Sequence, residues 1–239
     1  DARVLLERLA DEYLEHHLPH SYLLQVTPEL VDDRHLLKLV IRRWALKSGT
    51  TSIPAHRMRS FCKQLNGTDS SKHVELAWDD WKIRYYKRKL WLLTKKAIFT
   101  CPDIAWTELA GEIDLGPDVG LVSLREIQKP GSDTLPDASH SASFETLSVT
   151  ARNLTHLTRI KVGGHHKTLK KIFQATDIPP WLRNSIPLIR SGDELVGMGD
   201  WCFSDSFSSW MRQHGVELKW QPRHPLLQVI RNQQHRGQS

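Results

Sequence analysis

Two turn-forming pairs stand close together in the second half of the chain and restrict its fold more than any other stretch. Gly163 and Gly164 permit a backbone turn that residues with a Cβ resist. Pro179 and Pro180 cannot continue a helix, and each proline pushes the residue before it toward extended backbone. Residues 165–176 between the two pairs are expected to be helical. We therefore predict a basic turn that leads into a helix and then into a stiff corner over residues 159–189.

This expected helix separates apolar from cationic side chains. Its apolar positions recur with helical spacing at Leu169, Ile172, Phe173 and Thr176. Its cations fall on the opposite side, at Lys167, Lys170 and Lys171. Three ammonium groups would then lie near the exposed N–H groups of a helix start, where phosphate can bind. For Gly163 and Gly164, a plain helix-entry turn and a phosphate contact both remain open.

The charges are segregated along the chain, which has a net charge of +6. Residues 34–68 hold eight Lys or Arg and residues 81–102 hold seven, and neither block contains an acid. Residues 152–192 hold eight more against Asp177 alone, whereas nine acids stand between 103 and 145. Such asymmetry favours a polyanionic partner, although any single basic run can also be a solvated helix face.

Length and composition indicate a globular protein of two domains. The chain has 239 residues, of which 39% are hydrophobic, and no stretch approaches the ~18 apolar residues of a membrane span. We expect an α+β fold, with a helical first domain at 1–96 closed by a small antiparallel sheet and a mixed, strand-rich domain at 97–239. Residues 129–143 are expected to be a flexible loop, and the final RNQQHRGQS a frayed tail.

In the first domain, periodicity predicts two helices followed by strands. Asp32 or Asp33 can cap a helix that ends near Gly49, and Pro54 suits the first turn of the next helix. Three strand-like runs follow at 73–78, 81–88 and 89–93. Tyr85 and Tyr86, which stand among cations, could stack on bases or pack across strands.

The sequence predicts no catalytic residue and no metal site within the chain. It contains no G-x-x-x-x-G-K-[ST], G-x-S-x-G or H-E-x-x-H motif. Cys62, Cys101 and Cys202 stand far apart, so neither a disulfide framework nor a zinc site is indicated. Free cysteines fit a reducing compartment, and a cytoplasmic location is expected.

Several motifs resemble one bacterial enzyme family. G-x-x-K-x-L-K-K-I-F-Q, I-P-P-W-L-R, I-P-L-I and G-D-E-L-V follow one another between Val162 and Val196 and resemble the C-terminal domain of the tRNA(Ile)-lysidine synthetases. R-R-W-A at 42–45 and I-R-Y-Y-K-R-K-L-W-L-L at 83–93 resemble the middle domain of that family, in the same order. The resemblance implies a middle, tRNA-binding or substrate-binding domain at 1–96 and a C-terminal tRNA-binding domain at 97–239.

The resemblance also implies an activity for a parent enzyme. Lysidine synthetases carry an S-G-G-x-D-S phosphate loop in an N-terminal catalytic domain, and that sequence does not occur here. The parent would use ATP and Mg to adenylate C2 of the wobble cytidine of tRNA(Ile) with a CAU anticodon. Free lysine would then displace AMP, so that the tRNA reads AUA. This chain is expected to be an inactive fragment that docks the tRNA, with no membrane partner, and a homodimer remains open.

The same resemblance names candidate tRNA contacts. In the family the C-terminal domain is associated with the acceptor stem, which implies contacts at Lys167, Lys170, Lys171 and Arg183. The basic turn adds Lys161, Gly163 and Gly164, and the outward cations of the first domain add Arg42, Arg57 and Arg84. Two rival classes remain open: a stand-alone RNA-binding module and a protein-docking module for an acidic partner.

Overall fold

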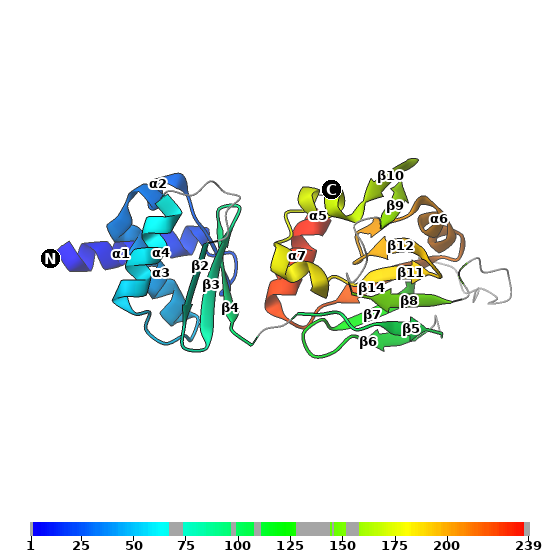
Figure 1. Cartoon of the computed structure of the whole chain (residues 1–239), viewed down its shortest axis with the longest axis horizontal. Coiled ribbons are helices and arrows are strands. Elements are labelled where there is room, and N and C mark those ends of the chain that lie inside the picture. Colours follow the sequence, from blue (N-terminus) through cyan, green and yellow to red (C-terminus); the bar gives the residue numbers. More distant parts are fainter. Residues whose placement is uncertain are drawn as a thin grey trace. The chain divides into compact units, whose positions relative to one another are not determined.

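The computed structural model describes residues 2–66, 74–96, 99–107, 111–127, 144, 146–151 and 158–236. The chain divides into two compact units, Asp1–Ile98 and Phe99–Ser239 (Figure 1). Both units combine helices with antiparallel sheets, so the predicted α+β class is confirmed. The expected loop at 129–143 lies outside the described residues. Among the described residues, none of the helices has the length and apolar character needed to cross a membrane.

Unit 1 packs helices on one antiparallel sheet. Its helices are α1 (Ala2–His17), α2 (Pro28–Asp32), α3 (Arg34–Lys47) and α4 (Ala55–Asn66). Its strands are β1 (Leu23–Gln25), β2 (Val74–Trp78), β3 (Trp81–Tyr86) and β4 (Lys89–Thr94). They form a sheet in the order β1-β4-β3-β2. The predicted helical domain closed by a small antiparallel sheet is therefore confirmed.

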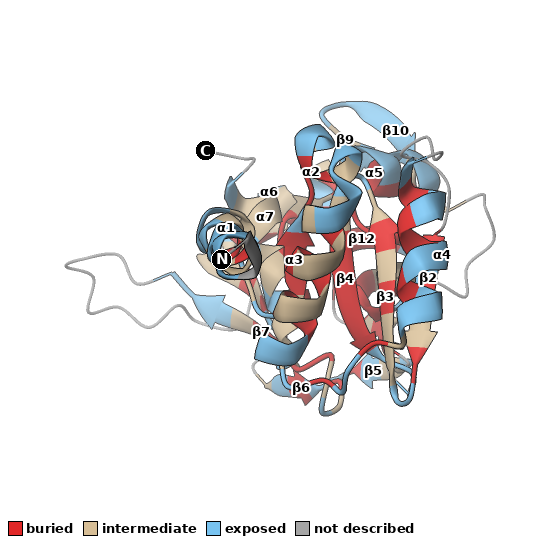
Figure 2. Cartoon of the chain, turned by 90° about the vertical axis from the view of Figure 1, so that its left-hand side faces the viewer, coloured by how far each residue is buried: buried red, intermediate tan, exposed pale blue. Residues whose placement is uncertain are grey.

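The local sequence explains these elements. Asp33 caps α3 because its carboxylate accepts hydrogen bonds of 3.0 Å from the N–H groups of His35 and Leu36. Helix α4 alternates buried and exposed residues (Figure 2), and it buries Met58, Phe61, Cys62 and Leu65 as its period predicts. Tyr85 is buried in the core. Its ring therefore packs across strands and is not available to stack on a base.

Unit 2 is rich in strands, as expected. Its largest sheet has the order β13-β12-β11-β8-β5 and consists of β5 (Ile104–Trp106), β8 (Leu147–Thr150), β11 (Leu188–Ser191), β12 (Glu194–Met198) and β13 (Cys202–Phe203). A second sheet, ordered β14-β7-β6, consists of β6 (Glu112–Asp114), β7 (Leu121–Glu126) and β14 (Val216–Gln221). A separate hairpin joins β9 (Arg159–Val162) to β10 (His165–Thr168).

Helical segments connect these strands or follow the last of them. They are α5 (Leu169–Ala175), the 3₁₀ helix η1 (Pro180–Ser185), α6 (Asp205–Gln213) and α7 (Pro225–Arg236). The prediction of helix over 165–176 is wrong at its start, because residues 165–168 are strand β10. The positive φ angles of Gly163 and Gly164, 61° and 76°, fold β10 back onto β9. Thr168 then caps α5 by accepting a hydrogen bond from the N–H of Lys171.

The pairing of β7 with β14 brings distant parts of unit 2 together. The register runs from Leu121 opposite Gln221 to Glu126 opposite Val216. Gly120, directly before β7, has a φ of 91°, and a Cβ at this position would lie 1.9 Å from the carbonyl oxygen of Gln221. Glycine is therefore required where the turn before β7 meets the end of β14.

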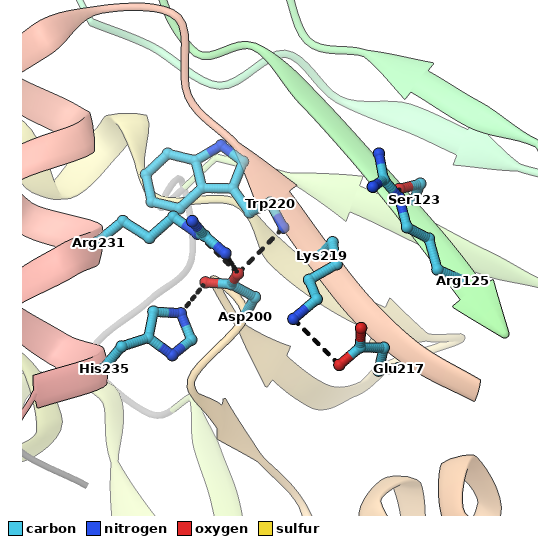
Figure 3. A network of polar contacts seen from close by, with 8 residues as sticks. All are labelled: Ser123, Arg125, Asp200, Glu217, Lys219, Trp220, Arg231 and His235. Carbon is cyan, nitrogen blue, oxygen red and sulfur yellow. Dashed lines mark hydrogen bonds and ion pairs between the residues drawn. The ribbon is translucent and has the colours of Figure 1, made fainter. Parts of the chain in front are cut away.

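The C-terminal segment is helix α7, so the frayed tail predicted for 231–239 is wrong over residues 231–236. Helix α7 buries Leu226, Leu227 and Ile230, an apolar set at helical spacing. Its Arg231 and His235 reach the side chain of Asp200, which has no exposed surface (Figure 3). Residues 237–239 lie outside the described residues. The apolar face and this polar contact hold the helix against the unit.

Candidate nucleic-acid interface

The β9–β10 hairpin carries the basic turn. His165 pairs with Val162, and His166 pairs with Lys161, so the two glycines form a two-residue loop. Alternate residues of a strand point to opposite faces. Lys161 and His166 therefore share one face, whereas Lys167 lies on the other face with the buried Ile160. Lys161, His166 and Lys167 are all exposed.

The tip of this hairpin is fixed by a carboxylate from another element. Asp205, the first residue of α6, accepts hydrogen bonds from the N–H groups of Gly163 and Gly164 at 2.7 and 2.8 Å. These bonds, from Gly164 first and then Gly163, lower the pKa of Asp205, and the charges of Lys161 and His165 add to the shift. Both glycine N–H groups thus point at one anionic group, which is a side chain of the same protein.

Helix α5, which follows β10, carries further exposed cations. Leu169, Ile172 and Phe173 are buried, and Phe173 has no exposed surface. Lys170 and Lys171 are exposed, so the predicted division between apolar and cationic side chains holds for them. Lys167 does not share their helical face, because it belongs to β10. The three lysines therefore come from a strand and a helix in succession.

Arg183 lies in η1, which begins at the second proline of the pair, and it makes contacts within the fold. Its Nε donates a hydrogen bond of 3.0 Å to the carbonyl oxygen of Ile178. Its guanidinium carbon lies 5.5 Å from the centroid of the Phe173 ring, a cation–π distance. Arg183 is half-buried and joins the corner to α5.

The three cations predicted in unit 1 come from three different elements. Arg57, on α4, donates from Nη1 to the carbonyl oxygen of Ala77. Arg84, on β3, places Nε 2.6 Å from Oε2 of Glu75 on the neighbouring strand. Arg42 lies half-buried on α3. At least two of these residues therefore have structural contacts within the unit.

Sequence reasoning missed two groups that the structure reveals. Asp205 was not a candidate, although Ser204 followed by Asp205 is a recognisable helix start, and Ser204 indeed caps α6. The contact of Arg231 and His235 with Asp200 was missed because the polar C-terminal segment is typical of a tail and Asp200 lies 31 positions before Arg231. Within the part of the chain that the structure describes, no group of three or more His, Cys, Asp or Glu could hold a metal ion.

Comparison with known proteins places this hairpin inside a described domain. Residues 147–220 match the family model for the TilS substrate C-terminal domain. The chain is 28% identical over 231 residues to the tRNA(Ile)-lysidine synthase of Methylococcus capsulatus. The aligned region covers 93% of this chain and 50% of that protein. It is 24% identical over 230 residues to the synthase of Coxiella burnetii, covering 93% of this chain and 48% of that one.

A third relative covers less of the chain. The tRNA(Ile)-lysidine synthase of Xanthomonas campestris is 28% identical over 188 residues, which is 78% of this chain and 40% of that protein. The chain thus spans half the length, or less, of these curated relatives. Residues 147–220 thus resemble the TilS substrate C-terminal domain, and the chain is similar along nearly its whole length to part of the tRNA(Ile)-lysidine synthases.

Proposed function

We propose that this chain binds tRNA(Ile) as the tRNA-docking part of a lysidine synthetase. The relatives bear the name tRNA(Ile)-lysidine synthase, and the family model covers the β9–β10 hairpin and α5. The parent enzyme would ligate lysine to C2 of the wobble cytidine with ATP and Mg, in the cytoplasm. The chain alone would dock the tRNA without catalysing the ligation.

This proposal rests on one observation: the cationic side chains are exposed, whereas the apolar side chains beside them are buried. Lys170 and Lys171 are exposed on α5, whereas the neighbouring Phe173 is fully buried. Lys161 is exposed on a hairpin whose tip is fixed by Asp205. Ammonium groups on an ordered scaffold are suited to phosphate oxygens, which position an RNA without reading its sequence.

The other predicted contacts receive weaker support from the geometry. Gly163 and Gly164 already donate their N–H groups to Asp205, so a phosphate would have to compete with a carboxylate. Arg183 and Arg57 donate hydrogen bonds to carbonyl oxygens, and Arg84 pairs with Glu75. We therefore rank Lys161, Lys167, Lys170 and Lys171 above these residues and above Arg42.

The test is a binding measurement on the purified chain with a tRNA(Ile) transcript that has a CAU anticodon. Log K should fall with log salt by roughly 0.7–0.9 for each phosphate neutralised, so five contacts predict a slope of about 4. A slope near zero would reject RNA docking and favour a protein-docking module. In the same reaction, ATP and lysine should yield no lysidine, and any lysidine formed would contradict the proposed inactivity of the isolated chain.

A further inference from the structure

The turn between β3 and β4 places two cations where the backbone disfavours them. Tyr86 pairs with Lys89, which leaves Lys87 and Arg88 as a two-residue loop. Their φ angles are 46° and 57°, both in the left-handed region. Two-residue hairpin loops with two positive φ angles strongly prefer Asn-Gly, because residues with a larger Cβ substituent are strained there. Strain retained in a turn is a reason to look for a function.

A cavity of about 250 Å³ lies beside this turn. It is lined by Gln25, Val26, Thr27, Pro28, Lys87, Arg88 and Lys89. The N–H of Val26 donates to the carbonyl oxygen of Arg88 at 2.9 Å, and Gln25 pairs with Lys89 across β1 and β4. The turn is thereby joined to the segment that leads into α2, so the walls of the cavity are held by backbone contacts.

The charged residues that line the cavity are all cations. Lys87, Arg88 and Lys89 supply three consecutive cations, and none of the described lining residues is an acid. One nearby acid is Glu29, at the start of α2. Its pKa is lowered first by its own backbone N–H, next by the hydroxyl of Thr27, and last by the charge of Arg88. The carboxylate of Glu29 is thus satisfied mainly at the start of its own helix.

We propose that this cavity binds a phosphate group of an RNA backbone, with Lys87 and Arg88 as the principal contacts. The inference rests on the proposed function, because the RNA would be the docked tRNA. Drug-sized ligands need roughly 300–1,000 Å³, so the cavity suits one charged group of a larger molecule. A polyanion also explains why the turn keeps two cations instead of the less strained Asn-Gly pair.

This explanation predicts opposite effects on stability and binding. Lys87→Asn with Arg88→Gly creates the preferred turn and should leave the melting temperature of the full chain unchanged or raised. The same double variant should bind tRNA more weakly, by roughly 5-fold for each cation–phosphate pair removed at about 0.15 M salt, with a salt slope lower by roughly 1–2. Lys87→Gln with Arg88→Gln removes the charge but keeps the strained turn, and should weaken binding equally.

A charge-matched control separates a local site from general electrostatics. Arg59→Gln with Lys63→Gln removes two exposed cations from α4, and should weaken binding less than either turn variant. If the wild type binds tRNA and the turn variants bind equally well, the cavity is not a phosphate site. If the turn variants and the α4 variant weaken tRNA binding equally, the proposed phosphate site would also be overturned. If the wild type itself does not bind tRNA, the proposed function fails, and this inference fails with it.

Discussion

The guanidinium of Arg231 lies 2.6 Å from the carboxylate of Asp200, measured from Nη2 to Oδ2. The side chain of Asp200 has no exposed surface, whereas that of Arg231 is 24% exposed. Asp200 also accepts hydrogen bonds from the N–H of Trp220 at 3.3 Å and from Nε of Arg231 at 2.7 Å, and His235 Nε2 lies 3.0 Å from it. One buried carboxylate therefore links α7 to β14.

Replacing Arg231 by Gln should destabilise the protein, because the buried carboxylate would lose its charged partner. We expect the free energy of unfolding to fall by roughly 1–3 kcal/mol, measured by urea denaturation. Arg236→Gln removes the same charge from the exposed end of α7 and serves as the control. If both variants unfold at the same urea concentration, the Asp200 contact does not stabilise the unit.

On α5, we expect one set of substitutions to change tRNA binding and another to change stability. Lys170→Ala with Lys171→Ala should leave the melting temperature nearly unchanged, because both side chains are exposed. Binding to tRNA should weaken, and the salt slope should fall by roughly 1–2. The control, Lys170→Arg with Lys171→Arg, keeps both charges and should retain binding. A minihelix with only the acceptor stem should lose affinity in parallel, and an anticodon hairpin should not.

Phe173→Ala should have the converse effect. Its fully buried ring contacts the guanidinium of Arg183, so the substitution removes core volume and a cation–π contact together. We expect the free energy of unfolding to fall by roughly 3–5 kcal/mol. Thermal unfolding followed by circular dichroism would measure it, and a melting temperature equal to that of the wild type would show that α5 does not depend on this ring.

The contact of Asp205 with the hairpin should depend on pH. Because folding lowers the pKa of Asp205, its stabilising contribution is present above the ordinary value of 3.8 and is lost as the pH falls through the lower folded value. The amide NMR signals of Gly163 and Gly164 should therefore shift together during acid titration. Asp205→Asn should abolish this shift, whereas Asp193→Asn, in an exposed turn, should leave it unchanged.

The cysteines should react slowly in the folded protein. Burial raises the pKa of the Cys101 thiol to about 12, and the charge of Asp103 adds to the rise. Burial also raises the pKa of Cys62 and Cys202. Thiolate is the reactive form, so iodoacetamide at pH 8 should label the native chain far more slowly than the urea-unfolded chain. Rapid labelling of Cys101 in the native chain would contradict its burial.

The sequence predicts those elements whose signal is local. Helix α4 repeats its apolar residues over three turns, and Asp33 stands where a cap is needed, so both could be identified without a partner. Residues 165–168 contain no apolar residue, and their strand exists because they pair with β9. The contact between Asp205 and Gly163 joins residues 42 positions apart, and no spacing rule connects them.

The pairing of β7 with β14 sets an order of events during synthesis. Hairpin strands β2, β3 and β4 of unit 1 pair with near neighbours and can form soon after they leave the ribosome. Strand β7 pairs with β6 at once, but its other edge must wait until residues 216–221 have been made. During that interval we expect one edge of β7 to lack its partner, including the position of Val122 that pairs with Trp220 in the folded unit. Unit 2 is therefore expected to be most prone to aggregation before residues 216–221 have been made.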